Sequence, residues 1–159
     1  MNRSSSVKLQ HFAEKFLHDL ENFDLPQQQI QFSALPKEIL NTTDGQYRIV
    51  ITHDEQAVGF FLLHATERVK DYSSNPKALL LTALTVDHKH QGMGFAKEGM
   101  LALSHFIKDF FPKYNEVVLV VNKKNIPAQN LYKKVGFVDT GIRKTGQIGE
   151  QILMSLLIT

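Results

Sequence analysis

Runs of apolar residues along the chain predict most of its strands. Residues 46–52 and 57–64 are two such runs separated by a short polar turn, which predicts a β-hairpin. Residues 77–86 (KALLLTALTV) and 116–121 (EVVLVV) are almost continuously apolar, a pattern typical of strands covered on both faces. Further strands are expected at 7–11, 137–143 and 151–158.

Segments whose apolar residues recur with helical spacing lie between these strands. Between the two continuously apolar strands, residues 94–111 have apolar side chains at steps of three and four, and Pro112 ends the pattern. Residues 125–135 form a second expected helix, because Asn125 is a good N-cap and Pro127 fits a first turn. Weaker helical patterns occupy 11–23 and 35–42, whereas 23–36, with two prolines, is expected to be irregular.

The order of these elements predicts the fold class. A helix between two continuously apolar strands indicates a crossover that returns the chain to a parallel neighbouring strand. The hairpins before and after it add antiparallel strands. We therefore expect an α/β (mixed α+β) protein of one domain, residues 1–159, with a mixed central sheet and helices on both faces.

Composition narrows the functional classes. A formal net charge of +2 is too small for a nucleic-acid-binding surface, so no nucleic-acid partner is expected. The chain has no cysteine, which excludes a thiol nucleophile, a disulfide and a thiolate metal site; His88 and His90 alone are too few to indicate another metal site. No segment is as apolar as a signal-peptide core or a membrane span, so we expect a cytoplasmic protein that does not enter a membrane.

The stretch QGMGFA, residues 91–96, lies where a buried strand should turn into the long helix. The first N–H groups of a helix lack internal acceptors and the helix dipole adds positive charge, so such a turn can bind a phosphate. Gly92 and Gly94 remove side chains and permit positive φ. A tight turn that needs glycine only for its geometry explains the same residues. A dinucleotide fold is not indicated, because the third glycine and the acidic residue after the next strand are missing.

Residues 91–96 fit the pattern Q/R-x-x-G-x-G/A, and residues 125–137 (NIPAQNLYKKVGF) fit N-x-x-A-x-x-L-Y-x-x-x-G-F. Together and in this order, the two motifs resemble the signatures of the GNAT superfamily of acyl-CoA-dependent N-acetyltransferases. The resemblance covers residues 46–158 well and 1–45 loosely. It implies a sheet of about seven strands that splays between the fourth and fifth, with the pantetheine arm of acetyl-CoA in the opening.

The resemblance also implies a role for each part of the chain. Residues 1–45 would form acceptor-side helices and a loop, 46–111 the cofactor-binding half, and 112–159 the C-terminal half. The residues expected to hold acetyl-CoA are Leu84, Thr85, Val86, Gln91, Gly92, Met93, Gly94, Phe95, Ala96, Asn125 and Tyr132. The residues expected beside the acceptor amine are Phe23, Gln29, Phe32 and His64. No metal is expected.

The implied reaction is direct attack of a primary amine on the thioester in a ternary complex, without a covalent enzyme intermediate. Such a reaction needs no protein nucleophile, which agrees with a chain that lacks cysteine and a G-x-S-x-G elbow. A main-chain N–H near Val86 would bind the oxyanion, and the Tyr132 hydroxyl would protonate the leaving thiolate. The glutamate that many relatives place on the fourth strand is missing, so a water relay is expected as the base. Its candidate links are Asp87, His64, His88 and Thr82.

Each assignment has an alternative. Tyr132 also suits a core position between a helix and the sheet, and Asn125 suits a simple N-cap. The chain as a whole also suits a non-catalytic acyl-CoA-binding sensor or interaction module. The sequence leaves open whether the acceptor is a small molecule, a peptide or a protein, and whether Phe110–Phe111 or the last strand forms a homodimer.

Overall fold

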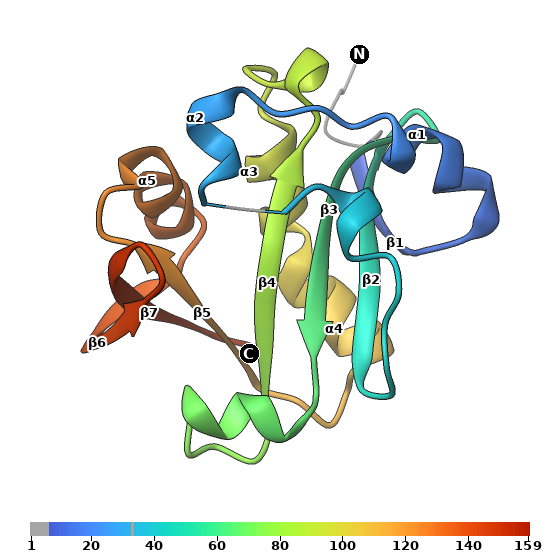
Figure 1. Ribbon diagram of the computed structural model, residues 1–159. Helices are drawn as coiled ribbons and strands as arrows, with labels where there is room; N and C mark the ends of the chain where they lie inside the picture. The colour runs from blue at the N-terminus through green and yellow to red at the C-terminus, as the bar shows by residue number, and fades with distance from the viewer. Residues whose placement is uncertain (1–6, 33) are drawn as a thin grey trace.

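Residues 7–32 and 34–159 are described by the computed structural model, in which seven strands form one sheet in the order β1-β2-β3-β4-β5-β7-β6 (Figure 1). Neighbouring strands are antiparallel except β4 and β5, which are parallel as the intervening helix predicts. The strands are β1 (Val7–His11), β2 (Gln46–His53), β3 (Gln56–His64), β4 (Ala78–Val86), β5 (Glu116–Asn122), β6 (Val138–Gly146) and β7 (Gly149–Leu157).

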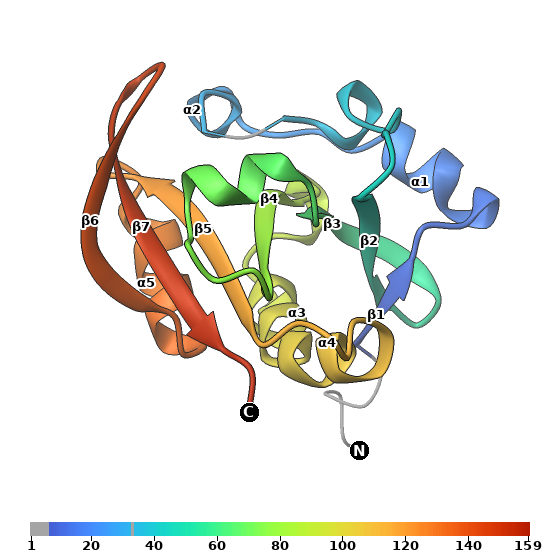
Figure 2. The ribbon, with the colours of Figure 1, turned by 90° about the horizontal axis from the view of Figure 1, so that it is seen from below.

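Helices cover both faces of the sheet. In Figure 2, α1 (Leu17–Glu21) and α2 (Gln27–Ile30) lie on one side of the strands. On the other side lie α3 (Phe95–Leu101), α4 (Leu103–Phe110) and α5 (Ile126–Lys134). Short 3-10 turns connect the elements: η2 (Glu14–Phe16), η3 (Pro36–Glu38), η4 (Glu67–Asp71) and η5 (His88–His90). The predicted mixed α/β fold is therefore confirmed.

Two expected helices differ in detail from the prediction. The helix expected at 94–111 is divided at Ala102, whose N–H is shared between the carbonyls of Glu98 and Gly99 at 3.2 Å each. This sharing tightens one turn without breaking the right-handed course. The helix expected at 11–23 begins later, because the N–H of Phe12 donates to the carbonyl of Arg48 at 3.0 Å and prolongs the pairing of β1 with β2.

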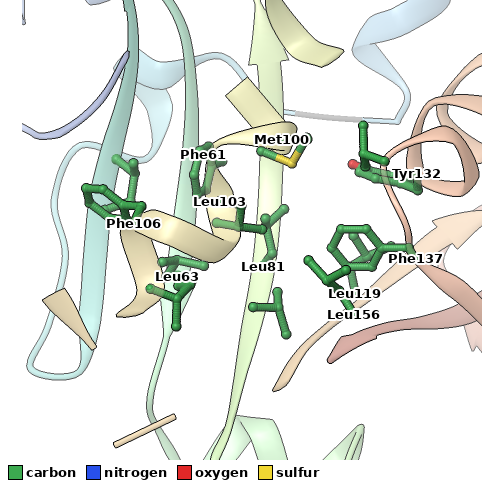
Figure 3. Close-up of a cluster of buried hydrophobic side chains, with 14 of the residues drawn as sticks. Phe61, Leu63, Leu81, Met100, Leu103, Phe106, Leu119, Tyr132, Phe137 and Leu156 are labelled. Atoms are coloured by element: carbon green, nitrogen blue, oxygen red, sulfur yellow. The ribbon is translucent and has the colours of Figure 1, made fainter. Parts of the chain in front are cut away.

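Two large hydrophobic clusters fill the space on the two sides of the sheet. The first lies between the strands and α3, α4 and α5, and Figure 3 shows many of its side chains. Those labelled are Phe61, Leu63, Leu81, Met100, Leu103, Phe106, Leu119, Tyr132, Phe137 and Leu156. The second cluster lies under α1 and includes Phe16, Leu20, Phe23, Phe60 and Leu62. The sheet is therefore covered on both sides where its strands are most apolar.

A close contact fixes α3 against the sheet. Ile51 of β2 lies between two glycines: an added Cβ would come within 2.8 Å of Ile51 Cδ1 at Gly59 of β3 and within 2.9 Å at Gly99 of α3. Both distances are too short for real side chains. The helix that follows the QGMGFA stretch can therefore lie this close to the strands only because these positions lack side chains.

The two surfaces considered for a homodimer differ in exposure. Phe110 is 56% exposed, whereas Phe111 is buried in the first cluster. The last strand, β7, is paired with β5 on one side and β6 on the other, so it has no free edge for a second copy. A homodimer stays a prediction.

Candidate functional site

The sheet opens between β4 and β5. The two strands pair only through Ala78–Leu80 and Glu116–Val118, and they diverge beyond these residues. The opening contains a cleft of about 1160 Å³ that is lined by residues 81–86 of β4 and 119–122 of β5. Residues of α2, η4, α5 and the β6–β7 turn complete its walls. The splay that the resemblance implied is therefore present, and it contains this cleft.

A bulge in β4 shapes one wall of the cleft. The register between β3 and β4 shifts after Phe60, so that Ala83 and Leu84 stand opposite a single residue of β3. Ala83 has a φ of +61°, in the left-handed region, which costs a residue with a Cβ about 1–2 kcal/mol. Bulges redirect the chain next to functional sites. The three expected β4 contacts, Leu84, Thr85 and Val86, all line the cleft.

The loop before α3 presents main-chain donors at the rim of this cleft. Gly92 and Gly94 have φ values of +79° and +83°, and a Cβ added to either would meet no atom within 4 Å. In the part of the chain that the structure describes, the N–H groups of residues 92–96 donate to no protein acceptor. Ala96 lines the cleft, Met93 is exposed and Phe95 is buried in the first cluster. The loop therefore has the open, donor-rich form that a phosphate-binding turn requires.

The hydrogen-bond donors of Gln91 have partners within the protein, which the sequence did not predict. Its Nε2 donates to the carbonyl of Val86 at 2.8 Å and to Oε1 of Gln29 at 2.9 Å, and Gln29 returns a hydrogen bond at 3.2 Å. Its main-chain N–H donates to the carbonyl of His88 at 3.2 Å. The donors of Gln91 are thus engaged within the protein. Gln91 therefore ties the loop to β4 and α2, and the open main-chain donors begin at Gly92. Because Gln91 lines the cleft, its contact with the cofactor stays a prediction.

Tyr132 lies where the second motif predicted, in the wall of the cleft. Its side chain is 8% exposed, and its ring packs edge-on against Phe137 with centroids 5.5 Å apart. Figure 3 shows the hydroxyl oxygen at the end of the ring that points toward β4. Burial raises the pKa of Tyr132, so the hydroxyl stays protonated throughout the physiological range. No protein group within the described ranges accepts its hydrogen.

Local interactions at the start of α5 set the position of Tyr132. Asn125 is the N-cap, with its side-chain oxygen accepting from the N–H of Ala128 at 3.3 Å. The buried Gln129 donates through Nε2 to the carbonyls of Asn122 at 3.0 Å and Lys123 at 2.8 Å. These bonds hold the helix to the end of β5. Asn125 also lines the cleft, so capping and ligand contact are compatible at this position.

A buried chain of hydrogen bonds ends at the cleft wall. His64 is 1% exposed, and its Nε2 lies 2.7 Å from Oγ1 of Thr82, which lines the cleft. Oε1 of Gln46 accepts from the N–H and the hydroxyl of Thr43 at 2.9 and 3.1 Å, which turns Nε2 of Gln46 toward Nδ1 of His64, 3.5 Å away. Burial, with a smaller contribution from the charge of Arg68, lowers the pKa of His64 to about 4. The ring is therefore neutral near pH 7.

The other residues expected near the acceptor divide into two groups. Gln29 and Phe32 line the cleft, as expected. Phe23 does not; it is 3% exposed within the cluster under α1, so we correct its role to packing behind the wall. His64 likewise lies behind the wall and reaches the cleft only through Thr82.

Two of the candidate relay residues lie outside the cleft lining. Asp87 is buried; its Oδ1 accepts from the N–H of Asp24 at 2.9 Å, and its Oδ2 lies 3.3 Å from Nζ of Lys89. This carboxylate holds the segment before α2 against the end of β4. His88 is exposed in η5 and is not among the lining residues.

The structure adds lining residues that sequence reasoning did not select. Arg68 and Tyr72, from η4 and its end, lie on the cleft wall, and so do Gln147 and Ile148 of the β6–β7 turn. Their segments carry no motif, and only the pairing of β4 with β5 and of β6 with β7 brings them together. No sequence signal identified them.

The described residues include neither a metal-binding cluster nor a membrane-spanning helix. No group of three or more His, Asp or Glu side chains there is arranged to hold a metal ion. No helix within the same ranges has the length and apolar character needed to cross a bilayer.

Comparison of the sequence with known proteins agrees with this geometry. A sequence model of the acetyltransferase (GNAT) family matches residues 12–137. The uncharacterized N-acetyltransferase YbbJ of Bacillus subtilis strain 168 is 41% identical over 155 residues, which cover 95% of this chain and 97% of that protein. Human N-acetyltransferase 8B is 37% identical over 73 residues, which cover 46% of this chain and 31% of that protein.

Solved structures share the fold at low sequence identity. AAC(6')-Ib in complex with paromomycin and acetyl-CoA has a TM-score of 0.74 and 15% identity, covering 96% of this chain and 93% of that chain. The ribosomal-protein-S18-alanine N-acetyltransferase of Escherichia coli has a TM-score of 0.65 and 16% identity, covering 96% and 94%. At these identities the likeness shows the fold alone.

Proposed function

The chain belongs to the acetyltransferase (GNAT) family, and we propose that it transfers the acetyl group of acetyl-CoA directly to a primary amine of a small molecule or peptide. The observation that carries this proposal is the cleft between β4 and β5. Open main-chain donors stand at its rim, at residues 92–96, and the Tyr132 hydroxyl lies in its wall without a partner among the residues that the structure describes. One opening thus offers an anion site and a proton donor.

The loop supports binding of the diphosphate of acetyl-CoA. Neither Gly92 nor Gly94 has protein atoms within 4 Å of the place where a Cβ would stand, so a diphosphate has room to approach the N–H groups. The pantetheine arm would then lie between Leu84–Val86 on β4 and Asn125 on α5, all of which line the cleft.

The proposed chemistry uses no covalent enzyme intermediate. The neutral amine attacks the thioester carbonyl carbon, an N–C bond forms, and the C–S bond breaks. A main-chain N–H of β4 near Val86 stabilises the oxyanion, and the departing thiolate takes the hydroxyl proton of Tyr132, which solvent then restores. Water accepts the extra proton of the attacking nitrogen, because no Asp or Glu is found among the described residues that line the cleft.

Release of free CoA thiol tests this function. The chain has no cysteine, so a thiol-specific reagent reports only the product when acetyl-CoA is mixed with a panel of primary amines. Tyr132→Phe removes the hydroxyl and keeps the ring, and we expect it to lower kcat by at least about tenfold while the KM for acetyl-CoA changes little. Tyr114→Phe is the matched control, because Tyr114 packs against the same hydrophobic cluster outside this cleft.

The outcomes separate the alternatives. Acetyl-CoA binding without thiol release on any amine would favour a non-catalytic acyl-CoA-binding module. Turnover that is equal in Tyr132→Phe and Tyr114→Phe would remove Tyr132 from the mechanism while keeping the enzyme.

A further inference from the structure

The acceptor side of the cleft holds a cation without a partner. Arg68 is exposed at the cleft wall, and in the described part of the chain its guanidinium forms no ion pair or hydrogen bond. Glu67, the neighbouring carboxylate on η4, is paired with Lys70 at 2.7 Å instead. Lys144 adds positive charge nearby, because its Nζ lies 5.7 Å from the ring centroid of Tyr72, which also lines the cleft.

The charges of the lining argue against a polycationic acceptor. The described residues that line the cleft include Arg68 and Lys124 but no Asp or Glu. A polyamine or an aminoglycoside carries several positive charges, and it would meet repulsion there without a compensating carboxylate. An acceptor that brings its own negative charge would instead be attracted.

Behind the cleft wall, the hydrogen bonds from Gln46 through His64 to Thr82 orient the Thr82 hydroxyl as a second donor. Because Nε2 of Gln46 faces Nδ1 of His64, Nδ1 accepts and the proton of the neutral ring is on Nε2. Nε2 then donates to Oγ1 of Thr82 at 2.7 Å. The hydroxyl hydrogen of Thr82 therefore points away from His64, and Thr82 lines the cleft. In this tautomer His64 is not a proton acceptor but a positioning residue that leaves the Thr82 hydroxyl as a donor.

We infer that the acceptor is an amine that also carries a carboxylate, and that the Arg68 guanidinium and the Thr82 hydroxyl bind this carboxylate. The inference rests on the proposed acetyl transfer and names its substrate class. A guanidinium binds a carboxylate through two parallel N–H donors, and a hydroxyl donor completes the site. The positive charge also helps the chemistry, because a nearby cation favours the neutral, attacking form of the amine in a cleft that lacks a carboxylate base.

Matched amine pairs test the inference. The probes are L-leucine and L-phenylalanine, the α-amides of both, and spermidine, each assayed for thiol release with acetyl-CoA. The measured quantity is kcat/KM for the acid divided by kcat/KM for its amide. Comparing this ratio between variants cancels the difference in the amines' own pKa values, because every variant meets the same two amines.

Three variants give distinct expectations. Arg68→Gln should lower the acid-to-amide ratio by at least about tenfold, and Thr82→Val by about threefold, while the KM for acetyl-CoA stays unchanged. Lys77→Gln, which removes an exposed cation just before β4 whose side chain is not among the residues lining this cleft, should leave the ratio as in the wild type. A ratio that does not respond to Arg68→Gln, or a wild-type preference for spermidine over both acids, overturns the inference while acetyl transfer itself stands.

Calorimetric titration of the same probes into the protein–CoA complex covers the case of no turnover. Acids that bind at least about tenfold more tightly than their amides, with the difference lost in Arg68→Gln, support the carboxylate site even if the proposed transfer fails. Equal binding of acid and amide removes the carboxylate site.

Discussion

Replacement of Gly94 by alanine should weaken cofactor binding without a clash in the free protein. Gly94 has φ +83° and ψ +10°, in the left-handed region, where a residue with a Cβ costs about 1–2 kcal/mol. Loss of unfolded-chain entropy offsets about 0.4–1 kcal/mol of this. No protein atom lies within 4 Å of the new methyl group, so no steric term adds to the backbone term. We expect the free energy of unfolding to fall by about 1 kcal/mol, measured by chemical denaturation.

Gly94→Ala should reduce the binding free energy of acetyl-CoA by more than it reduces the free energy of unfolding. The new methyl group adds bulk to the loop whose N–H groups, at residues 92–96, are proposed to bind the diphosphate. We expect the affinity for acetyl-CoA to fall by at least about tenfold, which corresponds to about 1.4 kcal/mol, measured by isothermal titration calorimetry.

A second glycine provides the matched control. Gly141 of β6 has a φ of +86°, also has no atom within 4 Å of an added Cβ, and does not line the cleft. Gly141→Ala should therefore lose similar stability and keep the affinity for acetyl-CoA. S-acetylpantetheine, which lacks the diphosphate, should be used equally by wild type and Gly94→Ala. If Gly94→Ala binds acetyl-CoA as tightly as Gly141→Ala does, the loop is not the diphosphate site.

Three further predictions concern residues that hold the elements around the cleft in place: His64, Gly99 and Asn125. Wild-type protein should lose about 3 kcal/mol of unfolding free energy as the pH falls from 6.5 to 4. Burial holds the folded-state pKa of His64 near 4, so in this range the unfolded state takes up a proton that the folded state does not. Well above pH 6.5 the ring is neutral in both states, and this loss is absent. His64→Gln should flatten that part of the pH profile, and an equally steep profile would show that other groups cause it. Gly99→Ala should lower the free energy of unfolding by about 1–3 kcal/mol, because the new Cβ meets Ile51. In the double variant, Ile51→Val should restore part of this loss. A Gly99→Ala protein that is more stable than the wild type would mean that α3 can shift away from the sheet. Asn125→Asp should keep the cap and Asn125→Ala should lose about 1 kcal/mol of unfolding free energy, both measured by thermal denaturation. Weaker acetyl-CoA binding by both variants would indicate that the side-chain N–H contacts the cofactor, whereas weaker binding by the Asp variant alone would indicate only charge repulsion.

The strands, and the parallel pairing of two of them, could be predicted from the sequence because continuously apolar runs have few other ways to be buried. The run at 77–86 became β4 and the run at 116–121 became β5, and the helical pattern between them made the pair parallel. Local helix boundaries were less predictable where tertiary contacts compete with propensity. The start of α1 is an example, since the N–H of Phe12 is taken by the carbonyl of Arg48.

The loop and Tyr132 could be predicted because each belongs to a motif with fixed spacing. The β4 bulge could not, because nothing in local propensity places an alanine such as Ala83 at positive φ. The contact between His64 and Thr82 joins residues 18 positions apart and depends on that bulge register. Arg68 is one of many exposed cations in the sequence, and only the tertiary arrangement distinguishes it.

The short pairing of β4 with β5 also has a consequence for where the sheet has strand edges. Beyond Leu80, β4 no longer pairs with β5, so these parts of the two strands border the internal cleft instead of the outer border of the sheet. Exposed strand edges recruit other chains and promote aggregation. Here the strand edges lie inside a cleft that is also lined by residues of α2, η4, α5 and the β6–β7 turn, so pairing with another chain at these edges would first require that cleft to be entered.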